Sequence, residues 1–578
     1  MKKQVDVAID LCAVYTNLRT NILQWKQASD LSEEVNRASE DTQVVLQKAR
    51  VNLERYIVMI ILMQYINESV YSDFKQPYRN WLLMHPECAN IIASVRTNPE
   101  QALTIPTANA GPIAGEDEST VRLRKGTVLS TGMILKADHF PTINQNEQQL
   151  VEGAPNFRRF PSTTIYACGV PTVSGVRNVM NHISTIDRSA SVIWINLREE
   201  PQLYINRVPY VLRSRTKPLR NVAMYSGILG SKLEQLELRL KADVLEEMKQ
   251  SKGKLIVHDE TATRQIVPTW ISPHLVETPR EVYESLLREG WKISYTRIPI
   301  TAETAPEVGD FEELLRILTS PEAENAHIVF NCQIGRGRST AAMAIAYLIR
   351  YWAHAKKEPI HVSEESENVA SLAFITALVR LLPDGQLVKR QVDYAISKAA
   401  VALNLRSTAL SFLKKVEEAR TPEDVKLYTR KAVSYLSRYA WLIIFNGYLA
   451  DNWSTSFSKP FSKWLAEREE ISTLLKEMYH APERALALNT SSITDRKDPR
   501  SVVARRSGNV LAAGTIIKYD HFPGCQRKGL EPVIDGAPNF RKVEGLNVYG
   551  VGIPTIEGVQ NVLKQIASQS GVLRVVWT

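Results

Sequence analysis

Cysteines are scarce and scattered in this sequence. Its 578 residues contain five, which follow neither a disulfide framework nor a metal-ligand spacing: Cys12, Cys88, Cys168, Cys332 and Cys525. An odd number of isolated cysteines is typical of a reducing compartment, and the N-terminal residues do not have the pattern of a signal peptide. We therefore expect a cytoplasmic protein without a bound metal or other cofactor.

Long apolar runs and clustered charge are also absent. The most apolar stretch, residues 56–66, has 11 residues and includes Gln64, so it predicts a buried helix and no transmembrane segment. The net charge of +9 is spread along the chain, without zinc spacing, an RNA-binding aromatic motif or a basic helix. This pattern disfavours nucleic acid as a partner. It fits either solubility alone or a preference for phosphates and acidic lipid headgroups, with peripheral membrane contact as one consequence.

One segment near the middle of the chain favours phosphate chemistry. The run NCQIGRGRST, residues 331–340, follows an apolar strand-like run and precedes an alanine-rich helix-like run. The backbone amides of such a loop can face an oxyanion at the N-terminus of the helix, and the same positive field favours a thiolate. The alternative, a buried core cysteine and a surface arginine, fits poorly with two glycines and two arginines.

The loop residues have distinct expected roles. We expect Cys332 to be the nucleophile, Arg338 to hold two phosphoryl oxygens, and Ser339 to stabilise the thiolate when it leaves. The predicted substrate-binding part consists of the residues between that Cys and that Arg: Gln333, Ile334, Gly335, Arg336 and Gly337. The glycines allow the backbone to turn and to approach a ligand. The second arginine either faces a polyanionic ligand or points into solvent.

The sequence repeats itself. Residues 126–141 (GTVLSTGMILKADHFP) return as 508–523 (GNVLAAGTIIKYDHFP), 382 positions later (508 minus 126). The GAPNFR segment at 153–158 returns at 536–541, and Trp81 corresponds to Trp464, both with a shift of 383 (536 minus 153, 464 minus 81). We therefore expect tandem repeats, one complete and two partial, and interpret the sequence as a fragment of a longer repeat protein.

These repeats predict the following domain organisation. The expected parts are a helical end of a preceding repeat (1–97), a linker (98–119), a complete repeat (120–480), a second linker (481–507) and the start of a further repeat (508–578). The complete repeat divides into an α/β part, about residues 120–366, and a helical part, about 367–480. Strands are predicted over residues 165–170, 191–196, 255–258 and 292–300, and helices near 174–184, over 232–250 and over 311–318 with Asp310 as N-cap. This order predicts an α/β fold with a central sheet and flanking helices.

The loop 331–340, the segment NLREEPQLYINRVPY at 196–210, the paired GAPNFR segments and the repeats together resemble the paladin family, which is related to the cysteine-dependent, tyrosine-phosphatase-like phytases. The resemblance implies a dual-specificity-phosphatase-like domain and a phosphocysteine mechanism. It implies phosphoinositides, inositol phosphates or phosphoproteins as substrates. On this interpretation Arg198, Glu199 and Glu200 brace the site, and Arg158 contacts phosphate or stabilises the fold.

One position departs from the related phytases, which place Asp after Thr in the strand before the phosphate loop. Here Ala302 follows Thr301, and alanine cannot donate a proton. Glu303 and Asp310 are the candidate general acids. The sequence therefore predicts a cysteine-dependent phosphoric monoester hydrolase, with a catalytically weak or inactive phosphate-binding scaffold, a pseudophosphatase, as the alternative.

Overall fold

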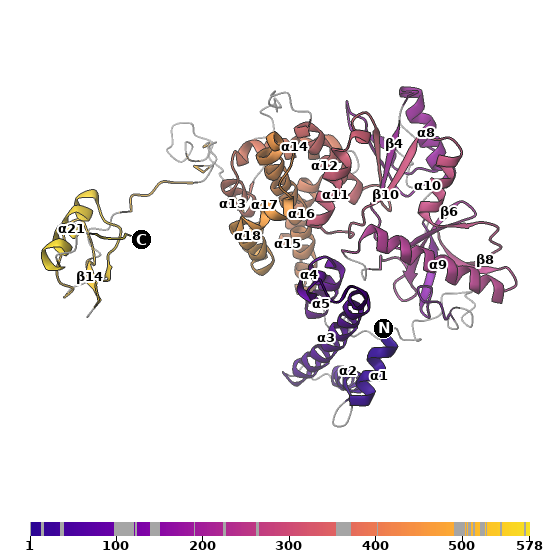
Figure 1. Ribbon diagram of the computed structural model, residues 1–578, viewed down its shortest axis with the longest axis horizontal. Coiled ribbons are helices and arrows are strands. Elements are labelled where there is room, and N and C mark those ends of the chain that lie inside the picture. Colours follow the sequence, from indigo (N-terminus) through magenta and orange to yellow (C-terminus); the bar gives the residue numbers. More distant parts are fainter. Residues whose placement is uncertain are drawn as a thin grey trace. The chain divides into compact units, whose positions relative to one another are not determined.

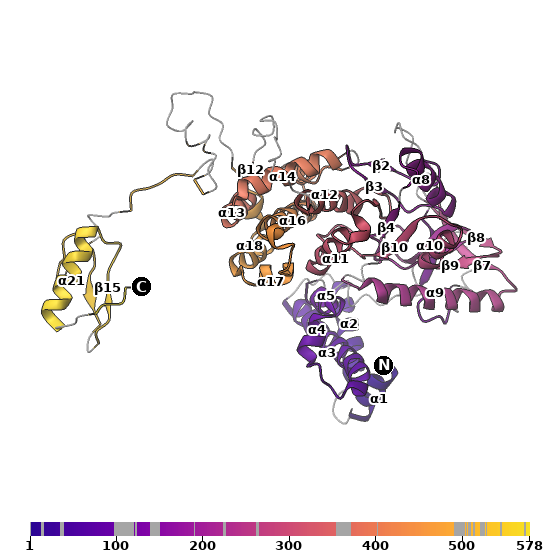
Figure 2. The ribbon, with the colours of Figure 1, turned by 45° about the horizontal axis from the view of Figure 1, so that its top comes forward.

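The computed structural model describes most of the chain (Figures 1 and 2). The described residues are 2–12, 17–34, 40–97, 121, 124–138, 151–189, 191–222, 227–261, 265–353, 371–400, 403–489, 503, 506, 510–511, 515–520, 526, 529–543, 546–570 and 574–577. The linker predicted over residues 98–119 lies outside them. The chain divides into two compact units, Met1–Thr490 and Ser491–Thr578.

A five-stranded sheet forms the centre of the first unit. Its order is β10 (Ile293–Arg297), β4 (Val192–Asn196), β11 (His327–Asn331), β3 (Ile165–Cys168) and β2 (Arg158–Arg159). The first four strands are parallel, and β2 pairs antiparallel at the edge. The predicted α/β fold with a central sheet is therefore confirmed.

Helices cover both faces of this sheet because its strands alternate between two apolar clusters. Ile193 and Phe330 face one cluster with α11 (Val308–Leu318) and α12 (Gly337–Ala353). Trp194 and Val329 face the other, with α8 (Val173–Ile186) and α10 (Pro279–Arg288). Alternate residues of a strand point to opposite faces, so both sets of side chains are buried. Figure 1 shows α8 and α10 on the opposite side of β4 and β10 from α11 and α12.

A second, mixed sheet lies within the same α/β part. Its order is β8 (Ile266–Ile271), β7 (Leu255–Glu260), β1 (Met133–Ala137), β6 (Val208–Ser214), β5 (Gln202–Ile205) and β9 (Val276–Glu277). Helix α9 (Gly230–Gln250) packs on it through Leu240 and Val244. The β4–β5 connection, residues 197–201, joins the two sheets and lies beside the phosphate loop.

The helical part of the complete repeat is built around one long helix. Its helices are α13 (Ala373–Leu381), α14 (Gly385–Ala399), α15 (Leu405–Glu418), α16 (Pro422–Asn452), α17 (Phe461–Ala466), α18 (Glu469–His480) and α19 (Pro482–Leu486). Thr421 caps α16 by accepting a hydrogen bond from the Asp424 amide, and Pro422 starts the helix. Within the segment predicted as a linker over 481–507, α19 packs its buried Ala485 and Leu486, and β13 (Leu488–Asn489) pairs with β12 (Ser371–Leu372). Most of the rest of that segment lies outside the described residues.

The N-terminal helices share particular side-chain contacts with the helical part of the complete repeat. They are α1 (Lys2–Cys12), α2 (Leu18–Glu34), α3 (Glu40–Ser69), α4 (Tyr78–Leu83) and α5 (Pro86–Thr97). The Tyr56 hydroxyl donates to Asp6 at 2.6 Å, and Tyr439 donates to Asp393 at 2.6 Å. Each aspartate also pairs with an arginine, at 3.2 Å and 3.1 Å. The predicted repetition therefore extends to individual side-chain hydrogen bonds and ion pairs.

The second unit is described by itself. It contains β14 (Arg541–Lys542), β15 (Tyr549–Gly550) and α21 (Ile556–Ser570) around a small core that includes Phe540 and Val562. Within the described parts of both units, none of the helices combines the length and the apolar character needed to cross a bilayer.

Candidate active site

The candidate nucleophile lies where the central strand meets its helix. Cys332 follows β11 directly, and α12 begins at Gly337, so the loop between them closes over the helix N-terminus. The Cys332 side chain is buried, with 3% of its surface exposed. Of the other predicted loop residues, Arg338 and Ser339 are buried, Gln333 and Ile334 are half-buried, and Arg336 is exposed.

The carbonyl groups of the loop point away from its centre. The Gln333 carbonyl accepts from the Val170 amide at 3.0 Å, and the Ile334 carbonyl accepts from the Asn156 side chain at 2.7 Å. The Gly335 carbonyl accepts from Arg158 at 2.6 Å. In a trans peptide the next amide points opposite to each carbonyl, so the amides face the other side. The amides of Gly335 and Ser339 favour the thiolate of Cys332 and lower its pKa, consistent with a cradle for an oxyanion.

Gly335 is required by this geometry. Its φ is +81°, and a Cβ at this position would lie 2.5 Å from the Cys168 carbonyl carbon. Only glycine accepts both the left-handed backbone and the close approach of β3. The GAPNFR segment contacts the loop backbone from outside. Arg158 of this segment stabilises the loop by donating to the Gly335 carbonyl and to the Thr340 hydroxyl, the latter at 2.8 Å.

The thiol of Cys332 is set up to ionise. Burial alone would raise its pKa, but the Arg338 charge, the Ser339 hydroxyl and the amides of Ser339 and Gly335 outweigh it, so the pKa lies below its ordinary value. At the nearby Cys168 burial outweighs the attraction of the Arg158 charge and raises the pKa of the thiol well above the ordinary range. The loop thus favours the thiolate at one of two adjacent cysteines.

The Arg338 guanidinium is held by the β4–β5 connection. It pairs with Glu200 at 3.4 Å and donates to the Ile300 carbonyl at 3.0 Å. Glu200 also pairs with Arg198 at 2.7 Å, and these cations outweigh burial and keep the pKa of Glu200 below its ordinary value. Arg198 pairs in addition with the buried Asp138. The expected bracing by residues 198–200 is present, and it orients the arginine fork.

A buried carboxyl group lies beside Ala302. Glu199 is 1% exposed and accepts from the Thr301 hydroxyl at 2.8 Å and from the Ala302 amide at 3.4 Å. Burial and the adjacent Glu200 raise the pKa of Glu199 to about 7. This carboxyl group therefore carries a proton over much of the neutral range, and the sequence pattern assigned it only a bracing role.

The two predicted acid candidates differ in position. Glu303 is exposed and has a φ of +65°. The expectation that Asp310 is an N-cap is wrong: α11 starts earlier, Glu307 is its N-cap, and Asp310 accepts from the Glu307 amide at 2.9 Å. Burial raises the pKa of Asp310 to about 8, with the nearby Glu307 and Glu199 adding to the shift.

The helical part contributes a residue that the sequence pattern did not indicate. Arg438 on α16 lies beside Gly337, although 101 positions separate the two in the sequence (438 minus 337). It donates to the Ser434 hydroxyl at 3.2 Å, and that hydroxyl in turn bonds to the Glu303 carbonyl. No local motif marks this arginine; only its correspondence to Arg55 in the preceding repeat could have drawn attention to it.

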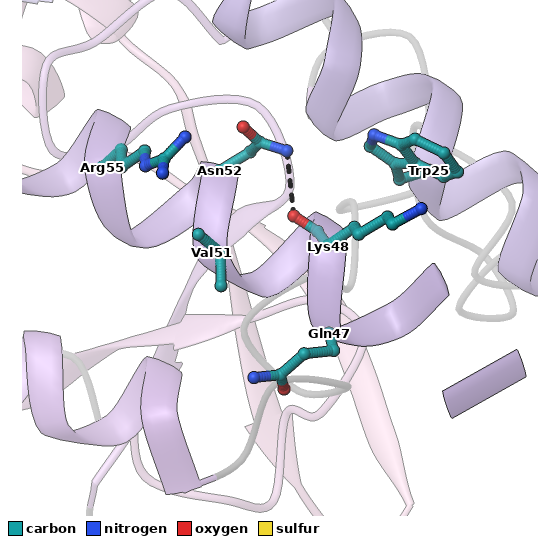
Figure 3. Close-up of a pocket in the computed structure, with 6 residues that line it drawn as sticks. All are labelled: Trp25, Gln47, Lys48, Val51, Asn52 and Arg55. Atoms are coloured by element: carbon teal, nitrogen blue, oxygen red, sulfur yellow. Dashed lines mark hydrogen bonds between the residues drawn. The ribbon is translucent and has the colours of Figure 1, made fainter. Parts of the chain in front are cut away.

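A hollow between α2 and α3 is a separate feature (Figure 3). It is lined by Trp25, Gln47, Lys48, Val51, Asn52 and Arg55. The Lys48 ammonium lies 4.6 Å from the centre of the Trp25 ring, a cation–π contact. The lining contains no nucleophile and no acid, so this hollow does not have the groups of a catalytic site.

The fold and the loop define a phosphatase-like scaffold of the tyrosine-phosphatase type. Residues 195–350 match the family model of the PTP-like phytases, and the description of that family reads "Inositol hexakisphosphate". The resemblance to paladin is confirmed: the chain is 27% identical to paladin of Homo sapiens over 484 residues, which cover 81% of this chain and 51% of that protein. It is 26% identical to paladin of Gallus gallus over 482 residues, 81% of this chain and 52% of that one. The chain spans about half the length of the curated relatives it matches.

Among solved structures, the chain is similar to a PTP-like myo-inositol phosphatase from Mitsuokella multacida, in complex with myo-inositol-(1,3,4,5)-tetrakisphosphate. The sequence identity is 16%, the TM-score is 0.38, and the match covers 75% of this chain and 58% of that one. A PTP-like phytase from Bdellovibrio bacteriovorus is also 16% identical, with a TM-score of 0.34, over 58% of this chain and 94% of that one.

Proposed function

We propose that the chain is a cysteine-dependent phosphatase that hydrolyses phosphate monoesters through a phosphocysteine intermediate. The observation that carries this proposal is the loop of residues 332–338, which combines outward-bonded carbonyls, an ionisable thiol and a buried guanidinium. The nucleophile and its stabilising groups are contiguous in sequence and converge in space.

The first step transfers the phosphoryl group to the protein. The Cys332 thiolate attacks phosphorus, an S–P bond forms, and the bond from phosphorus to the ester oxygen breaks. Arg338 and the loop amides hold the other phosphoryl oxygens during the transfer. In the second step water attacks phosphorus, inorganic phosphate leaves, and the thiolate is restored with hydrogen bonds from Ser339.

We assign the proton donor to Glu199, in place of the Glu303 and Asp310 candidates. Its protonated carboxyl group gives a proton to the leaving ester oxygen and recovers one from the attacking water. With a pKa of about 7, this carboxyl group can both donate and accept a proton near neutral pH. Glu303 is exposed, and Asp310 is engaged at the start of α11.

The proposed substrate class is phosphorylated inositol, free or as a lipid headgroup. Arg336 is exposed on the loop, where it can meet a second phosphate of a polyanionic ring, and the matched family carries the description inositol hexakisphosphate. Phosphoproteins, as the third predicted substrate class, and peripheral membrane contact remain predictions.

A specific observation favours a second function, a phosphate-binding scaffold with little turnover. Ala302 stands where the related phytases have an aspartate, and Glu199 is almost inaccessible to solvent. Such a protein would retain the loop and capture phosphate groups without hydrolysing alkyl esters efficiently.

Phosphate release separates the two functions. We expect the chain to release phosphate from inositol hexakisphosphate, from phosphoinositide vesicles or from an aryl phosphate, and Cys332→Ser to abolish the release. Binding without any release that depends on Cys332 would leave only the scaffold. Cleavage of the aryl phosphate alone would indicate that proton donation is defective, because a good leaving group needs no acid.

A further inference from the structure

Asp138 is a buried carboxylate at the end of a strand of the mixed sheet. It follows β1 directly, 0% of its surface is exposed, and its amide donates to the Pro209 carbonyl of β6 at 2.8 Å. It belongs to the repeated segment at residues 126–141, to which the proposed chemistry gives no role. The backbone of the mixed sheet thus fixes the place of this carboxylate.

The two oxygens of Asp138 connect the two ends of the phosphate loop. Oδ1 accepts from the side chain of Gln333, the residue after the nucleophile, at 3.4 Å. Oδ2 pairs with the buried Arg198 guanidinium. Arg198 pairs in turn with Glu200 at 2.7 Å, and Glu200 pairs with Arg338 at 3.4 Å. A continuous chain of side-chain contacts therefore joins Gln333 to Arg338 through the interior.

Glu200 is shared by several cations. Three guanidinium groups attract its carboxylate, those of Arg198, Arg338 and Arg213. Charges interact strongly in a buried site, and a buried cation without a counter-ion is costly. Asp138 supplies a further carboxylate, and it pairs with Arg198, which is not part of the loop. Because Arg198 is neutralised in this way, Glu200 remains available to Arg338.

We propose that Asp138 is a positioning residue for the phosphate loop: it neutralises Arg198 and so leaves Glu200 to hold the Arg338 guanidinium in its place. This inference rests on the proposed function in one respect, since it assumes that the loop binds the reacting phosphate. It gives the mixed sheet a direct part in that binding, although the loop itself is built on the central sheet.

Removal of the Asp138 charge has two opposite effects on phosphate affinity. The loss of a negative charge alone makes the site more positive, so Asp138→Asn would bind phosphate more tightly. If Asp138 positions the loop, however, Arg198 competes with Arg338 for Glu200, the Arg338 guanidinium leaves its place, and the variant binds phosphate more weakly. The direction of the change therefore tests the role.

The first test is calorimetric titration of the full chain carrying Cys332→Ser, with inorganic phosphate as the probe. We expect Asp138→Asn to weaken phosphate binding about 10-fold, because the charge-assisted contact from Arg338 is misplaced. Addition of Arg198→Gln should restore the affinity to within about threefold of the starting protein, because the competing cation is removed. A merely structural role predicts a further loss in this double variant.

The second test needs no ligand. It measures the rate at which iodoacetamide alkylates Cys332 at pH 6, with Cys332→Ser as the blank. The Arg338 charge favours the Cys332 thiolate, so its displacement in Asp138→Asn should slow alkylation about 10-fold. The loss of the Asp138 charge alone would accelerate alkylation, because a nearby negative charge disfavours a thiolate.

Two matched controls accompany these variants. Asp520 corresponds to Asp138 with the shift of 382 (520 minus 138), and it is exposed. Glu247→Gln breaks another largely buried ion pair, that with Arg124 at 2.8 Å, and Arg124 otherwise donates to carbonyls of β1 and β7. We expect Asp520→Asn and Glu247→Gln to leave phosphate affinity and alkylation unchanged, although Glu247→Gln lowers the melting temperature.

Three results would overturn the positioning role: phosphate binding in Asp138→Asn that is unchanged or tighter, alkylation that is unchanged or faster, and a double variant that binds more weakly than Asp138→Asn. If the single variant does not fold, the double variant, which removes the ion pair as a whole, is compared with the starting protein, and a loss beyond about threefold overturns the role. The proposed function has its own readout. If the wild-type chain releases no phosphate but Asp138→Asn still weakens phosphate binding, the positioning role stands and the phosphatase proposal falls.

Discussion

The Glu199 carboxyl group gives the sharpest test of the proposed chemistry. In the structure Thr301 and the Ala302 amide donate to different oxygens of the Glu199 carboxyl group, and Glu199→Gln keeps one of these acceptor oxygens while it removes the proton that can be donated. We expect hydrolysis of inositol hexakisphosphate to fall on the order of 10²- to 10⁴-fold, the usual loss for a general acid. Hydrolysis of an aryl phosphate should change much less, because its leaving group is stable without protonation.

The same substitution has a second effect, on stability. The pKa of Glu199 is about 7 in the folded protein and 4.5 ordinarily, so the folded state holds a proton that the unfolded chain releases between these values. The stabilisation is complete below pH 4.5 and is lost as the pH rises to about 7, a difference of about 3 kcal/mol. Glutamine does not ionise, so the variant should gain stability relative to wild type as the pH rises.

Two assays measure these effects. Initial rates with both substrates, from pH 5 to pH 9, give the substrate split, and denaturant unfolding at pH 5 and pH 8 gives the change in stability. Glu303→Gln is the control, since that carboxyl group is exposed and should leave both quantities unchanged. Equal losses on both substrates, or a loss in Glu303→Gln alone, would refute the assignment of Glu199.

Three further changes probe the loop itself. Cys332→Ser should abolish phosphate release while calorimetry still detects hexakisphosphate binding; retained release would exclude the phosphocysteine route. Gly335→Ala should lower the unfolding free energy by about 2 kcal/mol or more, because alanine would adopt a φ of +81° and its Cβ would collide with the backbone of Cys168; an unchanged denaturation midpoint would contradict this geometry. Asn156→Ala removes a donor to the Ile334 carbonyl, so we expect the free energy of unfolding to fall by about 1–3 kcal/mol and phosphate binding to weaken. Full phosphate affinity in that variant would argue against the loop architecture.

The GAPNFR segment illustrates how far pattern and structure agree. Its repetition indicated a structural unit, and Arg158 was expected to contact phosphate or to stabilise the fold. In the structure Arg158 and Asn156 donate to loop carbonyls, so the segment stabilises the backbone of the phosphate loop. The sequence could not show this, because the segment and the loop are more than 170 residues apart.

Local sequence determined the elements and the chemistry of the loop. The apolar alternation of the strands, the glycines and the Cys–Arg spacing act between residues that are near neighbours in the chain, so they predicted an α/β fold and a phosphate cradle without coordinates. Only the tertiary structure brought Glu199 beside Ala302 and Arg438 beside Gly337. These contacts, and the pKa shifts that burial causes in both side chains, depend on how the sheets and helices pack against one another. Such packing leaves no periodic pattern in the sequence.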